Sequence, residues 1–360
     1  MSIMQGREHP TMLTNRTLHL FSGRAESFWF FGRSLGIILA ALVVLDPTIG
    51  GDLKKPKAVL TWGTKGDGPG EFYSPIGIAI NAKDEVFVTD LNNCRLQRFT
   101  AEGKYLGGFD LPRDEPKRKS SQAGGILLDN QGHIYLSYMQ QHKVSIYTYD
   151  GKVVREWGKK GDGDGEFNQP GGMIFGPDGS LYVCDQCNHR IQKFTRDGKF
   201  LGKWGEHGAK PGQFGGIEKK GSRFGGPHFI TIDRKGRLYT TEGCEARVQQ
   251  LSLEGKPLAV WGNKTQEPGG FGALKLGYSP NPFGPIAVFV DRDDRVWVSS
   301  LNDRVQAFTP EGKYLYGIAG TGKGPGQLSR PHGMAMDSNG FLYVCDGSNQ
   351  RIQKFEIPAP

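Results

Sequence analysis

The sequence predicts an all-β protein, and three observations lead to that prediction. Short runs of alternating apolar residues recur along the chain, and glycine, proline and aspartate separate them, as in antiparallel hairpins. A Trp-Gly pair, or a residue in its place, closes each repeat at Trp62, Phe109, Trp157, Trp204, Trp261 and Ile318. A core of the type Tyr-Val-Cys-Asp…Arg-Ile-Gln-Lys-Phe occurs six times. Together these features predict a six-bladed β-propeller.

The clearest repeat lies between Gly165 and Gly205. It contains four short β-like runs: GMIF at 172–175, SLYVC at 180–184, RIQKF at 190–194 and KFLGKW at 199–204. A single four-stranded meander cannot bury both of its faces, so it needs copies of itself on either side. The repeat therefore predicts one blade of a larger ring.

The two ends of the chain predict how the ring closes. The sixth core ends at Phe355 and has no fourth strand after it. An unpaired strand, Ala58 to Trp62, precedes the first core. Closing the ring with this N-terminal outer strand removes the exposed edges that a linear array would leave.

The first 51 residues do not fit the repeat. Arg33 precedes an uninterrupted apolar run, Leu35 to Leu45, which at eleven residues is too short to span a bilayer and suits the core of a secretory signal. We expect residues 1–51 to be a signal peptide or N-terminal membrane anchor with a flexible leader, inserted in or crossing a membrane, and residues 52–360 to be the propeller. The expected location is periplasmic, cell-surface or membrane-anchored. A disordered tail on a cytosolic protein stays open as the alternative.

The repeat unit resembles the NHL repeat. The pattern Pro-x-Gly-Ile/Met-x-x-x-Asp-x-x-Gly-x-Leu-Tyr-Val-x-Asp-x-x-Asn-x-Arg-Ile-Gln-x-Phe is clearest at Pro75–Phe99, Pro170–Phe194 and Pro331–Phe355. The resemblance covers the chain after about residue 55 and implies the propeller fold. Propellers of this kind carry many unrelated functions, so the resemblance alone predicts none of them.

Acid–arginine pairs and cysteines recur within the repeats. Acids stand five residues before arginines at Asp90, Asp185, Glu242 and Asp346, which favours a structural charge-assisted hydrogen bond in each hairpin. Cys184 and Cys345 occupy one strand position, as expected for core filling. Cys187 and Cys244 occupy matching positions in neighbouring blades, so a disulfide between them stays open.

Three connections that lead into innermost strands break the repeat. They lie at residues 112–120, 215–224 and 269–283 and must emerge on one face of the disc. Non-repeating loops on a rigid scaffold are common binding surfaces. This basic face carries the candidate binding residues Arg113, Lys117, Arg118, Lys119, Lys219, Lys220, Arg223, Lys275 and Tyr278. Solvated loops without a ligand are the alternative.

Two histidines join the same face. His228 and His332 each follow the proline that leads into an innermost strand, in blades 4 and 6. This pattern resembles peptidylamidoglycolate lyases, propellers that cleave a hydroxyglycine to give a peptide amide and hold zinc with Pro-His at this position in alternate blades. The resemblance implies a third ligand in blade 2, where the chain has Gly124, and a catalytic tyrosine that the turn Asp185 to Arg190 lacks. Histidines that bond channel water or backbone are the alternative.

Two hypotheses about function follow. In the first, an exported, monomeric NHL-type propeller binds a protein, peptide or anionic polymer through its basic face, in keeping with a formal net charge of +8. Nucleic acid suits the charge but conflicts with export. In the second, His228 and His332 hold zinc or calcium in a metal-dependent lyase or hydrolase. The binding hypothesis names no cofactor and no catalytic residue.

Overall fold

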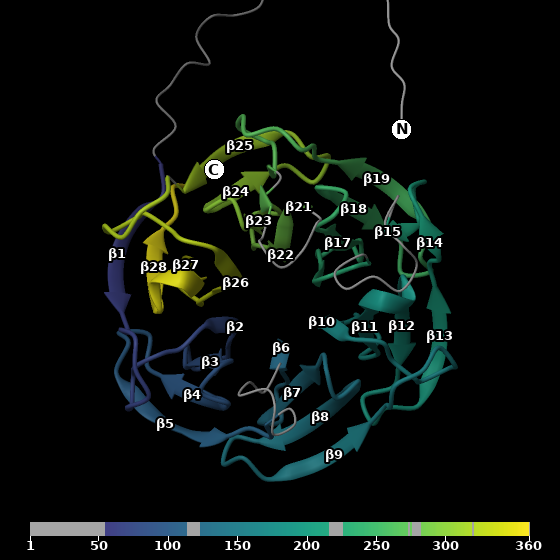
Figure 1. The fold of residues 1–360 in the computed structure, drawn as a ribbon, viewed down its shortest axis with the longest axis horizontal. Helices are drawn as coiled ribbons and strands as arrows, with labels where there is room; N and C mark the ends of the chain where they lie inside the picture. The colour runs from purple at the N-terminus through teal and green to yellow at the C-terminus, as the bar shows by residue number, and fades with distance from the viewer. Residues whose placement is uncertain are drawn as a thin grey trace, which may run out of the picture. The chain divides into compact units, whose positions relative to one another are not determined.

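The described residues form six four-stranded antiparallel sheets arranged around a central channel (Figure 1). This computed structural model describes residues 55–113, 123–215, 226–272, 274–275, 282–318 and 320–359, with the side chains of 274–275 and 282–283 left out. The all-β, six-bladed prediction is confirmed. Sheet order within each blade follows chain order from the channel outward, except that the outermost strand of blade 6 comes from the N-terminal end.

Blades 1 to 3 begin with β2, β6 and β10 at the channel. Their strands are β2 (Pro75–Ile80), β3 (Val86–Asp90), β4 (Arg95–Phe99), β5 (Tyr105–Asp110), β6 (Ala123–Leu128), β7 (His133–Tyr138), β8 (Lys143–Thr148), β9 (Val153–Trp157), β10 (Pro170–Phe175), β11 (Leu181–Asp185), β12 (Arg190–Phe194) and β13 (Phe200–Trp204). The third-strand prediction in blade 3 matches the structure, and the bounds of the other three strands differ from the predicted ones by at most two residues.

Blades 4 to 6 begin with β16, β22 and β26. Their strands are β16 (Ile230–Ile232), β17 (Leu238–Glu242), β18 (Arg247–Leu251), β19 (Pro257–Trp261), β22 (Pro285–Val290), β23 (Val296–Ser300), β24 (Arg304–Phe308), β25 (Tyr314–Ile318), β26 (Pro331–Met336), β27 (Phe341–Asp346), β28 (Arg351–Glu356) and β1 (Lys57–Trp62). Short pieces lie between blades or in turns: β14 (His207–Gly208), β15 (Phe214–Gly215), β20 (Leu274–Lys275), β21 (Pro282–Phe283), η1 (Gln186–Asn188) and η2 (Gly347–Asn349).

The N-terminal strand closes the ring as predicted. β1 pairs antiparallel with β28, from Lys57 opposite Glu356 to Trp62 opposite Ile352, and so supplies the missing outer strand of blade 6. In Figure 1 the first and last coloured strands lie side by side on the left of the ring. Closure through β1 leaves no blade without a neighbour.

The core lies between the blades rather than at the centre of the molecule. Between blades 3 and 4, for example, Tyr182 and Ile191 pack with Phe214, Leu238 and Leu251, all of them fully buried. Each such cluster joins residues of two adjacent sheets, so each blade is stabilised by its neighbours. Repeat proteins generally gain much of their stability from such contacts between neighbouring repeats.

The repeated tryptophan has a partner in the next blade, a turn glycine. Gly255 has φ +78°, and a Cβ atom there would lie 2.0 Å from Cδ1 of Trp204. Gly103, Gly198 and Gly312 meet Trp62, Trp157 and Trp261 in the same way. The tryptophan that closes one repeat and the glycine in the turn between the third and fourth strands of the next blade therefore form the two sides of one contact between blades.

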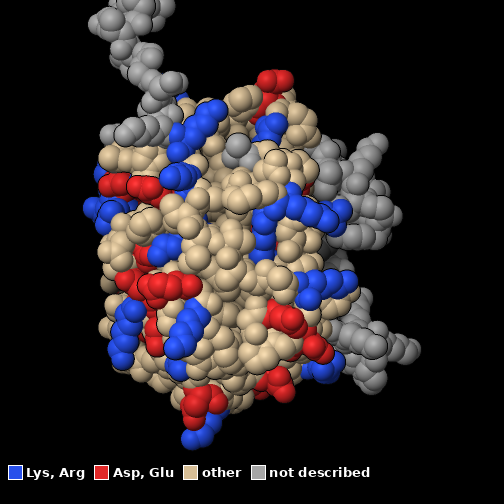
Figure 2. Space-filling view, turned by 90° about the vertical axis from the view of Figure 1, so that its left-hand side faces the viewer, with Lys and Arg blue, Asp and Glu red and all other residues tan. Residues whose placement is uncertain are grey.

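The outer surface near β1 carries charges of both signs. In Figure 2 lysine and arginine side chains alternate with aspartate and glutamate, with no continuous band of one sign among the described residues on this side. Interspersed charge on outer strands protects their unpaired edges from association. A partner selected by charge therefore has little to recognise on this side.

The predicted signal or anchor segment, residues 1–51, lies outside the described residues. In the part of the chain that the structure describes, no helix is long and apolar enough to cross a membrane.

Candidate ligand site at the channel mouth

Two residues of each blade surround one end of the central channel. The innermost strands begin at this end, because in five of the six blades the first residue of the innermost strand pairs with the last residue of the next strand, as Pro170 does with Asp185. We call this end the mouth. The residue that follows the proline, or in blade 2 the alanine, at the start of each innermost strand stands at the mouth position: Ile76, Gly124, Gly171, His228, Ile286 and His332. The residue after each second strand stands at the turn position: Leu91, Met139, Gln186, Gly243, Leu301 and Gly347.

Blade 4 differs slightly from the others at the mouth. Its innermost strand β16 begins at Ile230, so His228 lies two residues before the strand. The backbone of His228 still follows the blade, because its amide donates to the carbonyl oxygen of Thr241 at 2.9 Å. His228 is therefore fixed at the same level as its counterparts in the other blades.

The channel beyond the mouth contains a cavity of about 310 Å³ between the innermost strands. Thr231 is the one polar side chain among the described residues that line it, and the others are aliphatic, aromatic, methionine or glycine. The side chains that could form hydrogen bonds to a ligand therefore lie mainly at the mouth and not in the cavity.

In blades 2, 3, 4 and 6 a long residue at one of the two positions is accompanied by a glycine at the other. A Cβ atom on Gly347 would lie 2.9 Å from Cδ2 of His332, and one on Gly124 would lie 3.4 Å from Cε of Met139. His228 likewise shares its blade with Gly243. Blades 2, 3, 4 and 6 therefore each present one long side chain to the mouth, and three of the four are polar: Gln186, His228 and His332.

Backbone contacts between adjacent blades hold the mouth in place. The amide of Gly172 donates to the carbonyl oxygen of His228 at 2.7 Å. The hydroxyl of Ser137 donates to the carbonyl oxygen of Gly171, and that of Thr241 to Ile286, each at 2.5 Å. A Cβ atom on Gly171 would lie 2.3 Å from the oxygen of His228, so this blade admits only glycine at the mouth position. The site is therefore preorganised.

The electrostatic environment of the mouth combines imidazoles with a nearby exposed cation, Arg330. His228 is buried, with 3% of its surface exposed, whereas Arg330 is exposed beside His332. Removal from water lowers the pKa of His332 from 6.5 to about 4, and the charges of Arg330 and His228 act in the same direction. His332 is consequently a neutral imidazole at neutral pH, with one donor and one acceptor nitrogen. Both histidines stand at the mouth position of their blades, which are separated by blade 5.

Most of the predicted basic face lies outside the described residues. This is the case for Lys117, Arg118, Lys119, Lys219, Lys220, Arg223 and Tyr278. Arg113, which follows β5, is exposed as expected. Lys275 lies in β20, and its side chain is not described. The role of this face in binding stays a prediction.

The residues at the mouth do not fit a catalytic zinc site. Such sites take three protein ligands and leave one position open, whereas the mouth offers two imidazoles and has Gly124 where a third ligand is implied. Among the described residues no group of three or more His, Cys, Asp or Glu side chains could hold a metal ion. Calcium prefers oxygen ligands, and among the side chains at the mouth and turn positions only Gln186 offers one. These side chains therefore suit hydrogen bonding to a ligand better than coordination of a metal.

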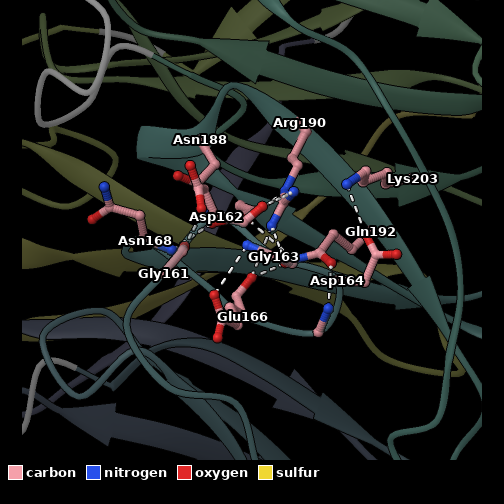
Figure 3. A network of polar contacts seen from close by, with 12 residues as sticks. Gly161, Asp162, Gly163, Asp164, Glu166, Asn168, Asn188, Arg190, Gln192 and Lys203 are labelled. Carbon is pink, nitrogen blue, oxygen red and sulfur yellow. Dashed lines mark hydrogen bonds and ion pairs between the residues drawn. The ribbon is translucent and has the colours of Figure 1, made fainter.

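The repeated acid–arginine pair is structural, as predicted. In blade 3, Nε of Arg190 lies 2.8 Å from Oδ2 of Asp185, and its other nitrogens donate to the carbonyl oxygens of Asp162, Gly163 and Glu166 (Figure 3). Gln192 donates to both Asp185 and the carbonyl oxygen of Glu166. The pair ties the Gly-rich connection between blades to the hairpin, so the charges of Arg190 and Asp185 are engaged in the scaffold.

All five cysteines lie in buried positions. No disulfide joins Cys187 to Cys244 in this structure. Cys184 is fully buried in the cluster between blades 3 and 4, as the core-filling interpretation predicts. Burial raises the pKa values of the Cys184 and Cys345 thiols, which makes both unreactive at neutral pH.

Sequence reasoning missed Gln186 and Met139. Neither belongs to a motif, and each lies in the turn between the second and third strands of its blade. Comparing the residue after each second strand across the six repeats would have found them, because Gln186 is the only amide at the turn position.

Comparisons with known proteins support the propeller fold. The sequence profile of the NHL repeat matches residues 72–99, 167–194 and 328–355. The chain is 30% identical over 90 residues to Protein brain tumor of Drosophila melanogaster and 33% identical over 141 residues to the peptidyl-glycine alpha-amidating monooxygenase of Mus musculus. These matches cover 25% and 36% of this chain but only 9% and 14% of the relatives' own length.

Solved structures support the same fold. Virginiamycin B lyase from Staphylococcus aureus superimposes with a TM-score of 0.52 at 17% identity, over 83% of this chain and 98% of that one. At this identity the likeness concerns the fold alone.

Proposed function

Since this chain is an NHL-repeat β-propeller, we propose that it binds an anionic ligand at the mouth of its central channel and over the basic face around it. The observation that carries the proposal is that His228 and His332 occupy the same position of two blades around one mouth, with the exposed cation Arg330 two residues before His332. Propellers commonly build such sites where loops meet a rigid scaffold. The ligand is a protein, a peptide or an anionic polymer.

Three features support this interpretation of the mouth. The neutral imidazole of His332 supplies directional hydrogen bonds, and Arg330 supplies a positive potential that favours an anion. The exposed Arg113 and the predicted basic residues of the three loops extend the same charge outward. The mixed charge of the surface near β1 offers no comparable attraction to an anionic partner (Figure 2).

A labelled polyglutamate peptide tests the proposal. Arg113→Gln and Arg330→Gln are expected to weaken its binding roughly two- to fivefold each, with weaker binding at high salt, because each removes one exposed cation. The matched controls are Lys104→Gln and Lys199→Gln, cations in turns at the opposite ends of the strands. Fluorescence anisotropy gives the affinities. Equal losses in both pairs of variants would contradict a site at the mouth.

Export is part of the proposal and rests on the apolar run Leu35 to Leu45. Residues 1–51 fused to a reporter enzyme that is active only outside the cytoplasm should give activity. The same fusion with two lysines placed within the run should give none. Equal activity from both fusions would argue against export by this segment.

A metal-dependent lyase or hydrolase is the second candidate. The similarity to the mouse amidating monooxygenase and the pair of histidines in alternate blades favour it. Zinc retained at about one equivalent after saturation and desalting, as a catalytic ligand set would hold it, and lost in His228→Ala and His332→Ala, would support it and justify assays with hydroxyglycine peptides. Retention of no zinc would leave the binding function alone.

A further inference from the structure

Gln186 stands at the mouth with its backbone fixed on both sides. It is the first residue of η1, directly after β11, and only 3% of its surface is exposed. A Cβ atom on Gly226 would lie 1.9 Å from its carbonyl oxygen, and one on Gly171 would lie 2.7 Å from its Nε2. The carboxamide therefore lies over the mouth position of blade 3, and the neighbouring blade 4 packs against its backbone.

The carboxamide oxygen has no hydrogen-bond partner among the described residues. A buried acceptor left unpaired costs about 1–3 kcal/mol, so its retention needs a reason. The fold does not supply one, because the same turn position holds leucine, methionine or glycine in the other five blades. A bound ligand that donates a hydrogen bond here would supply the missing partner.

The surroundings restrict what such a ligand is. Blade 2 places Met139 at the turn position next to that of Gln186, and blade 4 places His228 at the neighbouring mouth position. The carboxamide therefore lies between a blade with an apolar side chain and a blade with an imidazole. A planar polar group with an apolar body next to it would match both parts of this surface.

We propose that Gln186 is the specificity-determining residue of the mouth and that the ligand presents an amide group to it. A primary amide presents an N–H donor and a C=O acceptor on one edge, so it pairs with a glutamine carboxamide through two hydrogen bonds in either orientation of the side chain. A site built around a buried hydrogen bond rejects an analogue that lacks it far more strongly than a hydrophobic pocket does. This inference rests on the proposed function, because it concerns the same site.

Benzamide and methyl benzoate are the probes, since they share one ring and differ in that the ester has no N–H donor. We expect saturation-transfer difference NMR on the full chain to give at least about fivefold tighter binding of benzamide, because the ester leaves the buried acceptor unpaired. Gln186→Leu should remove this preference, and Gln131→Leu, the same exchange in the exposed turn between β6 and β7 at the opposite end of the strands, should keep it. Equal binding of both probes, or binding of neither, would overturn the inference.

Thermal unfolding separates a ligand-binding role from a structural one. Gln186→Leu removes an unpaired buried acceptor, so its unfolding midpoint should equal or exceed that of the native chain. A lower midpoint would show that the carboxamide stabilises the fold, which contradicts the inference. Polyglutamate binding reports on the proposed function independently: if it persists while the two small probes bind equally, only the role of Gln186 fails.

Discussion

His228 and His332 owe their positions to glycines as much as to their own strands. Each histidine shares its blade with a glycine at the turn position, and in blade 2 the relation is reversed, with Gly124 beneath Met139. In blades 2, 4 and 6 the mouth therefore holds either a histidine at the mouth position or a long side chain at the turn position. Placing a histidine and a glycine at these two positions of blade 2 tests whether the blades are equivalent.

Blade 2 should accept the histidine arrangement of blades 4 and 6. The double variant Gly124→His, Met139→Gly places a third imidazole at the mouth, where the only side-chain atoms within 4 Å of the new Cβ, those of Met139, have been removed. We expect this protein to retain about one equivalent of zinc after desalting, because three imidazoles complete a catalytic-type ligand set.

The native chain and Met139→Gly alone should retain far less zinc, as measured by mass spectrometry. Equal metal content in all three proteins would mean that the mouth positions of blades 2, 4 and 6 do not converge as described.

At the scale of elements, the Arg190–Asp185 pair holds a hairpin and a connection together. Asp185 is fully buried, and Arg190 has 6% of its surface exposed. Breaking a buried pair from one side leaves a charge without its partner. The bond network of Figure 3 therefore predicts a large effect from a small chemical change.

Asp185→Asn should lower the free energy of unfolding by about 3 kcal/mol, because the guanidinium of Arg190 loses its counter-ion while staying buried. Asp150→Asn is the control, since Asp150 pairs with Lys152 on the surface, and its loss should change stability by less than about 0.5 kcal/mol. Urea denaturation measures both. A loss of less than about 1 kcal/mol in Asp185→Asn, the size expected of an ordinary hydrogen bond, would contradict the structural role of the pair.

The elements of this fold were largely predictable, and the site only in part. The strands could be predicted from the alternation of apolar and polar residues and from the turn residues, because both reflect local backbone and burial preferences. The closure of the ring could be predicted from the number of repeats and from the unpaired strand before the first one. His228 and His332 were found because they interrupt a repeat. Gln186 was not, because its importance comes from a missing partner in three dimensions, which no spacing in the sequence reveals.

At the scale of the whole propeller, one strand holds the ring closed. β1 pairs with β28 along its length, and Trp62 packs against Gly103 of blade 1. Without β1, blade 6 would expose the edge of β28 and lose its contact across the seam.

Compared with residues 55–360, which keep β1, residues 63–360 should therefore have a lower unfolding midpoint and a greater tendency to self-associate. Differential scanning calorimetry and light scattering measure the two effects. An unchanged midpoint and a monomeric state after removal of β1 would show that closure adds little to stability.

The central claim is that ligand binds at the mouth, and two methionine methyl groups test it most directly. Met139 stands at the mouth, and Met336 ends β26 at the other end of the innermost strand. With methyl-labelled methionine, addition of polyglutamate should shift the NMR signal of Met139 and leave that of Met336 in place. A shift of Met336 without one of Met139 would contradict the account.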